Sequence, residues 1–213
     1  MPDDMAQSHI VSPKRDAIVA AATELFLEHG FGDVSMDAIA AKAAVSKRTV
    51  YSHFENKAHL FEGIMSDKCA LNDFVGRQFG EDSAVPVDPP EQVLTQLGQA
   101  FLGAICSNEG VALYRVVMAE GNKFPELGKT FYNFGPESIS RALGAYLEDQ
   151  TAKGVLDVDN FSQAANQFLA MLSEPIIMEL TIGVRGPINE KEIGEIVDAS
   201  VSTFLRAFNT NEH

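Results

Sequence analysis

The stretch SMDAIAAKAAVSKRTVYSHFENK, residues 35–57, decides the fold. Its apolar residues recur at helical spacing on both sides of a short break. Ser35 and Ser46 are good N-cap residues, so the sequence predicts one helix over 36–43 and another over 46–53. Two short helices joined by a tight break, the second of them basic, are typical of a helix-turn-helix.

The second of these helices has two different faces. Taken at about 100° per residue from the start of the helix, Val50 and Phe54 fall within about 80° and are expected to face the core. Arg48, Tyr51 and Ser52 fall between roughly 140° and 240°, on the opposite side. Such side chains can bond phosphates, and Arg can also bond guanine through both donors. An ordinary solvated helix is the alternative interpretation.

Charge is distributed unevenly along the chain. The net charge of −14 and the sequence pI of about 4.7 argue, taken alone, against nucleic-acid binding. Residues 1–60, however, hold 6 Lys+Arg and 8 Asp+Glu, whereas residues 61–213 hold 10 and 22. Between residues 40 and 60 the sequence has four basic residues and a single acidic one. This asymmetry indicates a nucleic-acid-facing end in front of an acidic body.

Helical spacing continues outward from this segment, without a convincing strand or repeat, and predicts an all-α protein. The stretch Gly80–Pro90 contains three prolines and three acids and is expected to be a linker. Further helices are expected at about 12–28, from 57, and at 91–107, 109–121, 125–134, 136–153, 161–180 and 189–209.

The last two expected helices carry the widest apolar faces of the chain. The helix over 161–180 is apolar nearly all round, so it is either central in the core or covered by a partner chain. We expect these two helices to form a dimer interface. Its candidate residues are Phe168, Leu172, Ile176, Val197, Val201, Phe204, Leu205 and Phe208.

The same region holds aromatic, methionine and a few charged side chains that suit an adaptable ligand pocket. Core packing is the competing interpretation for each of them. Arg115 and Glu174 are the stronger candidates, because charged groups within apolar helices are costly unless they are paired or bound. The full candidate set is Phe101, Tyr114, Arg115, Met118, Met171, Glu174 and Met178.

Several classes of protein are not expected. No stretch of 18 apolar residues and no signal peptide occur, so we expect a cytoplasmic protein without a membrane span. The two cysteines, Cys69 and Cys106, are expected to be reduced and mostly buried. No catalytic motif, phosphate-binding loop or metal-ligand spacing is found, so no enzyme activity, cofactor or metal is expected.

The run RDAIVAAATELFLEHGFGDVSMDAIAAKAAVSKRTVYSHFENKAHLFEGIM, residues 15–65, resembles the DNA-binding domain of the TetR/AcrR family of bacterial transcriptional regulators. The shared elements are AA…LF…GF, S-x-x-x-IA-x-x-A, VS-x-x-T-x-Y-x-HF and NK-x-x-L. The stretches FPELGKTF (124–131) and GVLDVDNFSQAANQF (154–168) are similar to the AefR-like branch. The resemblance implies a DNA-binding domain over 12–72, with its helix-turn-helix at about 35–54, and a ligand-binding and dimerisation domain over 73–213.

The resemblance also implies which residues contact DNA. Ser35, Tyr51, His53 and Lys57 match positions that meet phosphates, whereas Lys47 and Arg48 match positions that read bases or the adjacent backbone. Many members carry a small residue where this chain has Arg48, so its operator is expected to differ. The expected DNA-binding set is Ser35, Ser46, Lys47, Arg48, Thr49, Tyr51, His53 and Lys57.

Together these observations predict a homodimeric transcriptional regulator, expected to be a repressor, that a small-molecule effector releases from its operator DNA. The alternative is a helical enzyme or small-molecule carrier with a vestigial helix-turn-helix. The basic, well-capped second helix argues against this alternative.

Overall fold

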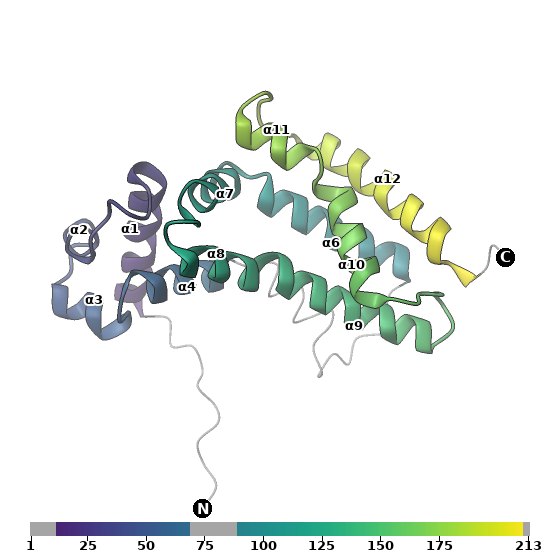
Figure 1. Ribbon diagram of the computed structural model, residues 1–213, viewed down its shortest axis with the longest axis horizontal. Helices are drawn as coiled ribbons and strands as arrows, with labels where there is room; N and C mark the ends of the chain where they lie inside the picture. The colour runs from purple at the N-terminus through teal and green to yellow at the C-terminus, as the bar shows by residue number, and fades with distance from the viewer. Residues whose placement is uncertain (1–11, 69–88, 211–213) are drawn as a thin grey trace, which may run out of the picture.

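The computed structural model describes residues 12–68 and 89–210 of the 213-residue chain. This part of the chain is helical, and its extended pairing is limited to an isolated bridge between Leu156 and Asn209. The predicted all-α class is therefore confirmed. Figure 1 shows the first helices at one end of an elongated molecule and the last helices toward the other end.

The N-terminal helices begin at the residues that the sequence marks as caps. The side chains of Ser35, Ser46 and Asn56 each accept a hydrogen bond from the backbone N–H three residues further on, at 3.1, 3.1 and 2.9 Å. These bonds satisfy N–H groups that the first turn of a helix leaves without a partner. The helices are α1 (Pro13–His29), α2 (Met36–Lys42), α3 (Lys47–His53) and α4 (Lys57–Lys68).

A cluster of aromatic rings forms the core of this N-terminal unit. The ring centroid of Phe26 lies 5.1 Å from that of Phe31 and 6.5 Å from that of Phe61. Val117 and Leu127, from the second half of the chain, are buried in the same cluster. The N-terminal core is therefore closed by side chains that come from outside the unit.

The second half of the chain has a core of its own. The rings of Phe168 and Phe204 meet edge to face with their centroids 5.2 Å apart. A Cβ on Gly98 would lie 3.1 Å from both Val197 methyl groups, so a glycine lets two helices approach closely there. The helices are α6 (Pro90–Ile105), α7 (Asn108–Glu120), α8 (Pro125–Tyr132), η1 (Asn133–Glu137), α9 (Ser138–Ala152), α10 (Phe161–Ser173), α11 (Ile176–Ile182) and α12 (Glu190–Phe208).

Two expected helix boundaries were wrong. The predicted break between 125–134 and 136–153 is a π-helical turn, η1, through which α8 and α9 run on as one rod (Figure 1). Conversely, the helix predicted over 161–180 is broken into α10 and α11 at Pro175. Proline removes a backbone donor and clashes with the preceding turn, so the longer helix ends there.

Some expectations fall on residues that the structure does not describe. The boundary between residues 72 and 73, the first nine residues of the expected linker and Cys69 lie outside the described residues. Cys106 is described, is buried and is not in a disulfide, and burial raises the pKa of its thiol. Among the described helices, none is long and apolar enough to cross a membrane.

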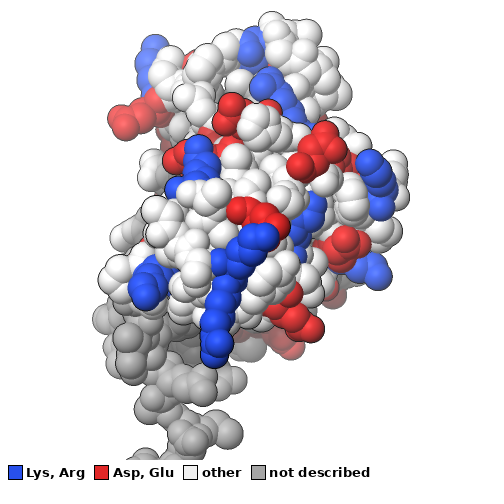
Figure 2. Space-filling model, turned by 90° about the vertical axis from the view of Figure 1, so that its left-hand side faces the viewer, with Lys and Arg blue, Asp and Glu red and all other residues white. Residues whose placement is uncertain are grey.

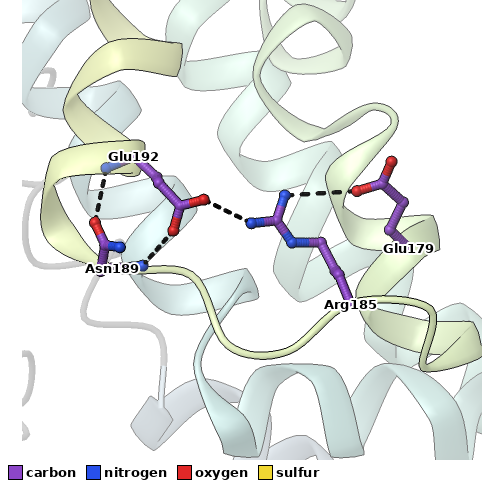
Figure 3. A network of polar contacts seen from close by, with 4 residues as sticks. All are labelled: Glu179, Arg185, Asn189 and Glu192. Atoms are coloured by element: carbon purple, nitrogen blue, oxygen red, sulfur yellow. Dashed lines mark hydrogen bonds and ion pairs between the residues drawn. The ribbon is translucent and has the colours of Figure 1, made fainter.

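Arg185 holds the corner between α11 and α12 (Figure 3). Its guanidinium donates to Glu192 at 2.8 Å and lies 3.5 Å from the Glu179 carboxylate. The Glu192 carboxylate also accepts the Asn189 N–H at 3.1 Å, and the Asn189 side chain accepts the Glu192 N–H at 3.0 Å. This capping box and the nearby Arg185 lower the pKa of Glu192.

The Glu192→Gln substitution is expected to destabilise the protein at neutral pH, because it removes the charge that faces Arg185. Since the folded-state pKa is lowered, the carboxylate stabilises the fold above the ordinary pKa range of glutamate. That contribution is lost as the pH falls through the lowered pKa. The melting temperatures of wild type and variant should therefore converge in acid.

The matched control is Glu195→Gln, which disrupts the highly exposed Lys191–Glu195 pair at 3.5 Å. Exposed pairs contribute little, so this variant is expected to melt like wild type. Equal losses of melting temperature in both variants would contradict a stabilising role of the Glu192 charge. A loss in Glu192→Gln that does not change with pH would contradict it as well.

Candidate nucleic-acid interface

The turn between α2 and α3 fixes the angle between the two helices. Ala44 has a φ of +54°, and its N–H donates to the Ala41 carbonyl at 3.2 Å. The Val45 N–H donates to the Ala40 carbonyl at 3.1 Å. This pair of bonds is the Schellman pattern that closes a helix C-terminus. The turn is therefore hydrogen-bonded although its left-handed position carries an alanine.

Helix α3 is attached to the protein through one of its faces. Val50 is fully buried and Phe54 nearly so, whereas Arg48, Tyr51 and Ser52 are exposed. The predicted division of the helix into a core face and an outer face is confirmed by this burial. Tyr51 is 54% exposed, so its hydroxyl can reach a partner outside the protein.

The hydroxyl groups at the start of α3 are ordered by one another. The Ser46 and Thr49 hydroxyls lie 2.8 Å apart, and the Ser52 hydroxyl donates to the Thr49 carbonyl at 2.8 Å. Ser35 and Ser46 accept backbone bonds as helix caps while staying exposed. Each has a hydroxyl group that can still donate to a phosphate.

Two neighbouring cations on α3 are held differently. The Lys47 ammonium donates to the Asp37 carboxylate of α2 at 2.5 Å, with both side chains more than half exposed. For Arg48, which is exposed, no hydrogen bond or ion pair is found within the described part of the chain. Arg48 is therefore available to DNA directly, whereas Lys47 must leave or share Asp37.

The remaining candidates lie at the edge of the unit. The half-buried ring of His53 lies 6.4 Å from that of Phe54. The Lys57 ammonium donates to the carbonyls of Phe31 and Gly32, at 2.5 and 3.1 Å. Partial burial lowers the pKa of Lys57, although nearby carboxylates act in the opposite direction and raise it. A phosphate contact by Lys57 stays a prediction, since loop carbonyls hold its ammonium in this structure.

Figure 2 looks onto the end of the molecule that carries α2 and α3. Lys and Arg side chains are spread over this face, with acidic side chains between them. The surface is therefore mixed rather than a continuous basic patch. Recognition must then depend on individually placed cations more than on overall charge.

The expected pocket residues are divided between the second core and the surface. Phe101 is buried in the second core, and Tyr114 and Met171 pack partly against it. The other four, Arg115, Met118, Glu174 and Met178, are exposed. Arg115 donates to the carbonyls of Thr181 and Leu180, at 2.8 and 2.6 Å. A hollow of about 450 Å³ does lie between α6 and α12, but its lining includes none of these seven residues.

The residues expected at the dimer interface lie mainly inside the protomer. Six of them are at most 4% exposed: Phe168, Leu172, Ile176, Val197, Val201 and Phe204. Leu205 and Phe208 pack against the same core while partly exposed. The apolar faces of α10, α11 and α12 that the sequence shows therefore pack against the core of the same chain. The six buried side chains are therefore not exposed to a partner chain.

The capped α2–α3 unit with its exposed Arg, Tyr and Ser face defines the class of protein, a helix-turn-helix DNA-binding protein. Comparison with known families agrees. Residues 18–64 match the tetR family of bacterial regulatory proteins, and residues 92–210 match the C-terminal domain of AefR-like transcriptional repressors. The chain belongs to the TetR family of transcriptional regulators, in its AefR-like branch.

Individual relatives span nearly the whole chain. The transcriptional regulator UidR of Escherichia coli K12 is 27% identical over 197 residues, which are 92% of this chain and 90% of UidR. A TetR-family regulator from Mesorhizobium loti has a solved structure with a TM-score of 0.77 and 28% identity, covering 92% of this chain and 97% of that one. The structure of the flavonoid-responsive regulator FrrA has a TM-score of 0.71 and 32% sequence identity. The match covers 93% of this chain and 98% of FrrA.

The sequence interpretation missed two acidic residues that shape this interface. Asp37 lies in the first turn of α2, and its pairing with Lys47 depends on the angle between the two helices. Glu120, on α7, contacts the α1–α2 loop, 88 and 89 residues away in the chain. Neither pairing leaves a local signal in the sequence, because each depends on tertiary structure.

The Asp37→Asn substitution is expected to strengthen binding to duplex DNA of any sequence, because it frees the Lys47 ammonium and removes a negative charge. The gain should be a few-fold, in keeping with about 0.2–1 kcal/mol for an exposed ion pair. The slope of log affinity against log salt should steepen by up to about one unit. Fluorescence anisotropy with a random-sequence duplex over a salt series measures both quantities.

Asp157→Asn is the control, because it removes an equal charge at an exposed position between α9 and α10. It should leave the salt slope unchanged. If both variants gain equally, net charge explains the effect, and the Asp37–Lys47 pair does not.

Proposed function

We propose that this protein is a homodimeric repressor whose α3 reads operator DNA in the major groove. The proposal is carried by Arg48 in the first turn of α3, which is exposed and has no ion-pair partner among the described residues. In a helix-turn-helix the first turn of the second helix points most directly at base edges. Membership of the TetR family and the AefR-like repressor domain support the same function.

Arg48→Ala tests base reading. If the guanidinium bonds a guanine through two donors, its loss should cost about 1–3 kcal/mol and relax the preference at one base pair in each half-site. Sequences selected from a random duplex library by wild type and variant, at one fixed salt concentration, show whether that position becomes degenerate. Arg141→Ala, which removes an exposed arginine from α9, is the matched control.

Identical selected motifs for wild type and Arg48→Ala would contradict base reading by Arg48. A wild-type protein that enriches no motif at all would contradict the proposed function itself.

We propose that the dimer forms through the corner of α7 and α11. Four large apolar side chains are more than half exposed there: Met118 on α7, Met178 and Ile182 on α11, and Val184 just after it. Met178 and Ile182 are four residues apart and share one face of α11. Arg115 holds α7 against the end of α11, so the four side chains lie on adjoining elements. A twofold axis at this corner would pair the patch with itself.

Ile182→Glu is expected to give monomers, because it places a charge where apolar surface would be buried. Operator affinity should fall with it, since one half-site alone gives little specificity. Light scattering at a fixed protein concentration reports the mass. The control is Val155→Glu, which changes an exposed apolar residue near α9, away from α11. Dimers retained in Ile182→Glu would contradict this interface.

We propose further that a small organic molecule controls the repressor. FrrA, which is 32% identical over 93% of this chain, is described as flavonoid-responsive, and this supports an effector of aromatic character. The effector would favour a dimer whose two α3 helices no longer fit the operator. Titrating a flavonoid into the operator complex and measuring release of DNA tests this part.

A further inference from the structure

The C-terminal end of α7 is hydrogen-bonded to the loop between α1 and α2. Glu120 is the last residue of α7, and its two carboxylate oxygens accept the backbone N–H groups of Phe31 and Gly32, at 2.8 and 2.6 Å. Hydrogen bonds to an ionised carboxylate are shorter and stronger than neutral ones. A carboxylate from the body of the protein is thus bonded directly to the DNA-binding unit.

The same two residues are also bonded through their carbonyl groups. The Lys57 ammonium of α4 donates to the carbonyls of Phe31 and Gly32. It also lies 4.6 Å from the centre of the Phe31 ring and 5.9 Å from that of Phe124. The loop is therefore held between an acid of the body and a base of the DNA-binding unit, which we call the loop clamp (Glu120, Lys57 and the backbone of 31–32).

Glycines on both sides of Phe31 make room for the carboxylate. Gly30 has a φ of +82°, and a Cβ there would lie 2.3 Å from a Glu120 oxygen. A Cβ on Gly32 would lie 2.9 Å from the other oxygen and 3.0 Å from the Phe124 ring. Real Cβ atoms do not approach oxygen so closely, so the sequence Gly-Phe-Gly at 30–32 accommodates this contact.

Helix α7 is also fixed nearer its middle. Arg115, five residues before Glu120, donates to the last carbonyls of α11, where a positive charge is favoured by the helix dipole. One helix is therefore hydrogen-bonded to α11 through Arg115 and to the α1–α2 loop through Glu120. A displacement of α11 would be transmitted along α7 to the DNA-binding unit.

We propose that Glu120 is a positioning residue for operator recognition: through the loop clamp it sets the orientation in which each protomer presents α3, and so the half-site spacing that a dimer accepts. The inference rests on the proposed DNA-binding function. Without the carboxylate, apolar packing such as the Phe31–Phe124 ring contact, at 5.3 Å, would still hold the unit but would define its orientation less sharply.

The test compares wild type with Glu120→Gln, which has nearly the same shape but can accept only one of the two N–H bonds with its amide oxygen. Both full-length proteins select sequences from a random duplex library. The variant should enrich the same half-site motif over a wider range of spacings. Its affinity for the best wild-type operator should fall roughly 10-fold, the scale of losing a charge-assisted hydrogen bond. A purely structural role would not broaden the spacing.

Glu126→Gln is the control, because Glu126 is an exposed acid on α8 whose charge also acts on Lys57. It should keep the wild-type spacing. Unchanged spacing and affinity in Glu120→Gln would overturn the proposal while leaving DNA binding intact. Loss of cooperative melting in Glu120→Gln would assign Glu120 to stability instead and would also overturn it. A wild-type protein that enriches no motif would contradict the proposed DNA-binding function itself, before any role of Glu120 is tested.

Discussion

The recognition surface depends on the burial of Val50 and Phe54. Helix α3 is seven residues long, and an isolated helix of that length is not stable in water. It persists because these two side chains are inserted into the N-terminal core, while Ser46 caps its first turn. The same anchoring dictates which side chains face outward. Arg48 and Tyr51 are exposed at fixed positions because the opposite face of the helix is held.

The N-terminal core includes side chains from the second half of the chain. These side chains link the DNA-binding unit to the rest of the molecule. Val117 and Leu127 complete the core from α7 and α8, and Glu120 bonds the loop beside it. Apolar packing supplies most of the attachment but is non-directional, whereas hydrogen bonds to a carboxylate are directional. The two kinds of contact together give the DNA-binding unit both its attachment and its orientation. A change at α11 can reach the unit through α7, which contacts both.

Local signals predicted the helix-turn-helix well and the second half of the chain less well. The caps at Ser35 and Ser46 and the 100° periodicity depend on neighbouring residues, so sequence alone predicted α2, α3 and the division of α3 into two faces. Wide apolar faces on the last helices could not be assigned to core or partner from sequence, because periodicity does not say what covers a face. The structure places Phe168 and Phe204 inside one protomer and leaves Ile182 exposed. The pairing of Lys47 with Asp37, and of Glu120 with the loop, depends on tertiary geometry that no local pattern encodes.

Hydroxyl-radical footprinting of the wild-type protein on the DNA upstream of its own gene tests the central claim most directly. The claim is that two α3 helices, related by a twofold axis, occupy major grooves on one side of an operator. The account predicts two protected stretches of equal size, related by symmetry and separated by about one helical turn or a multiple of it. A single protected stretch, or no protection at any concentration that saturates non-specific binding, would contradict it.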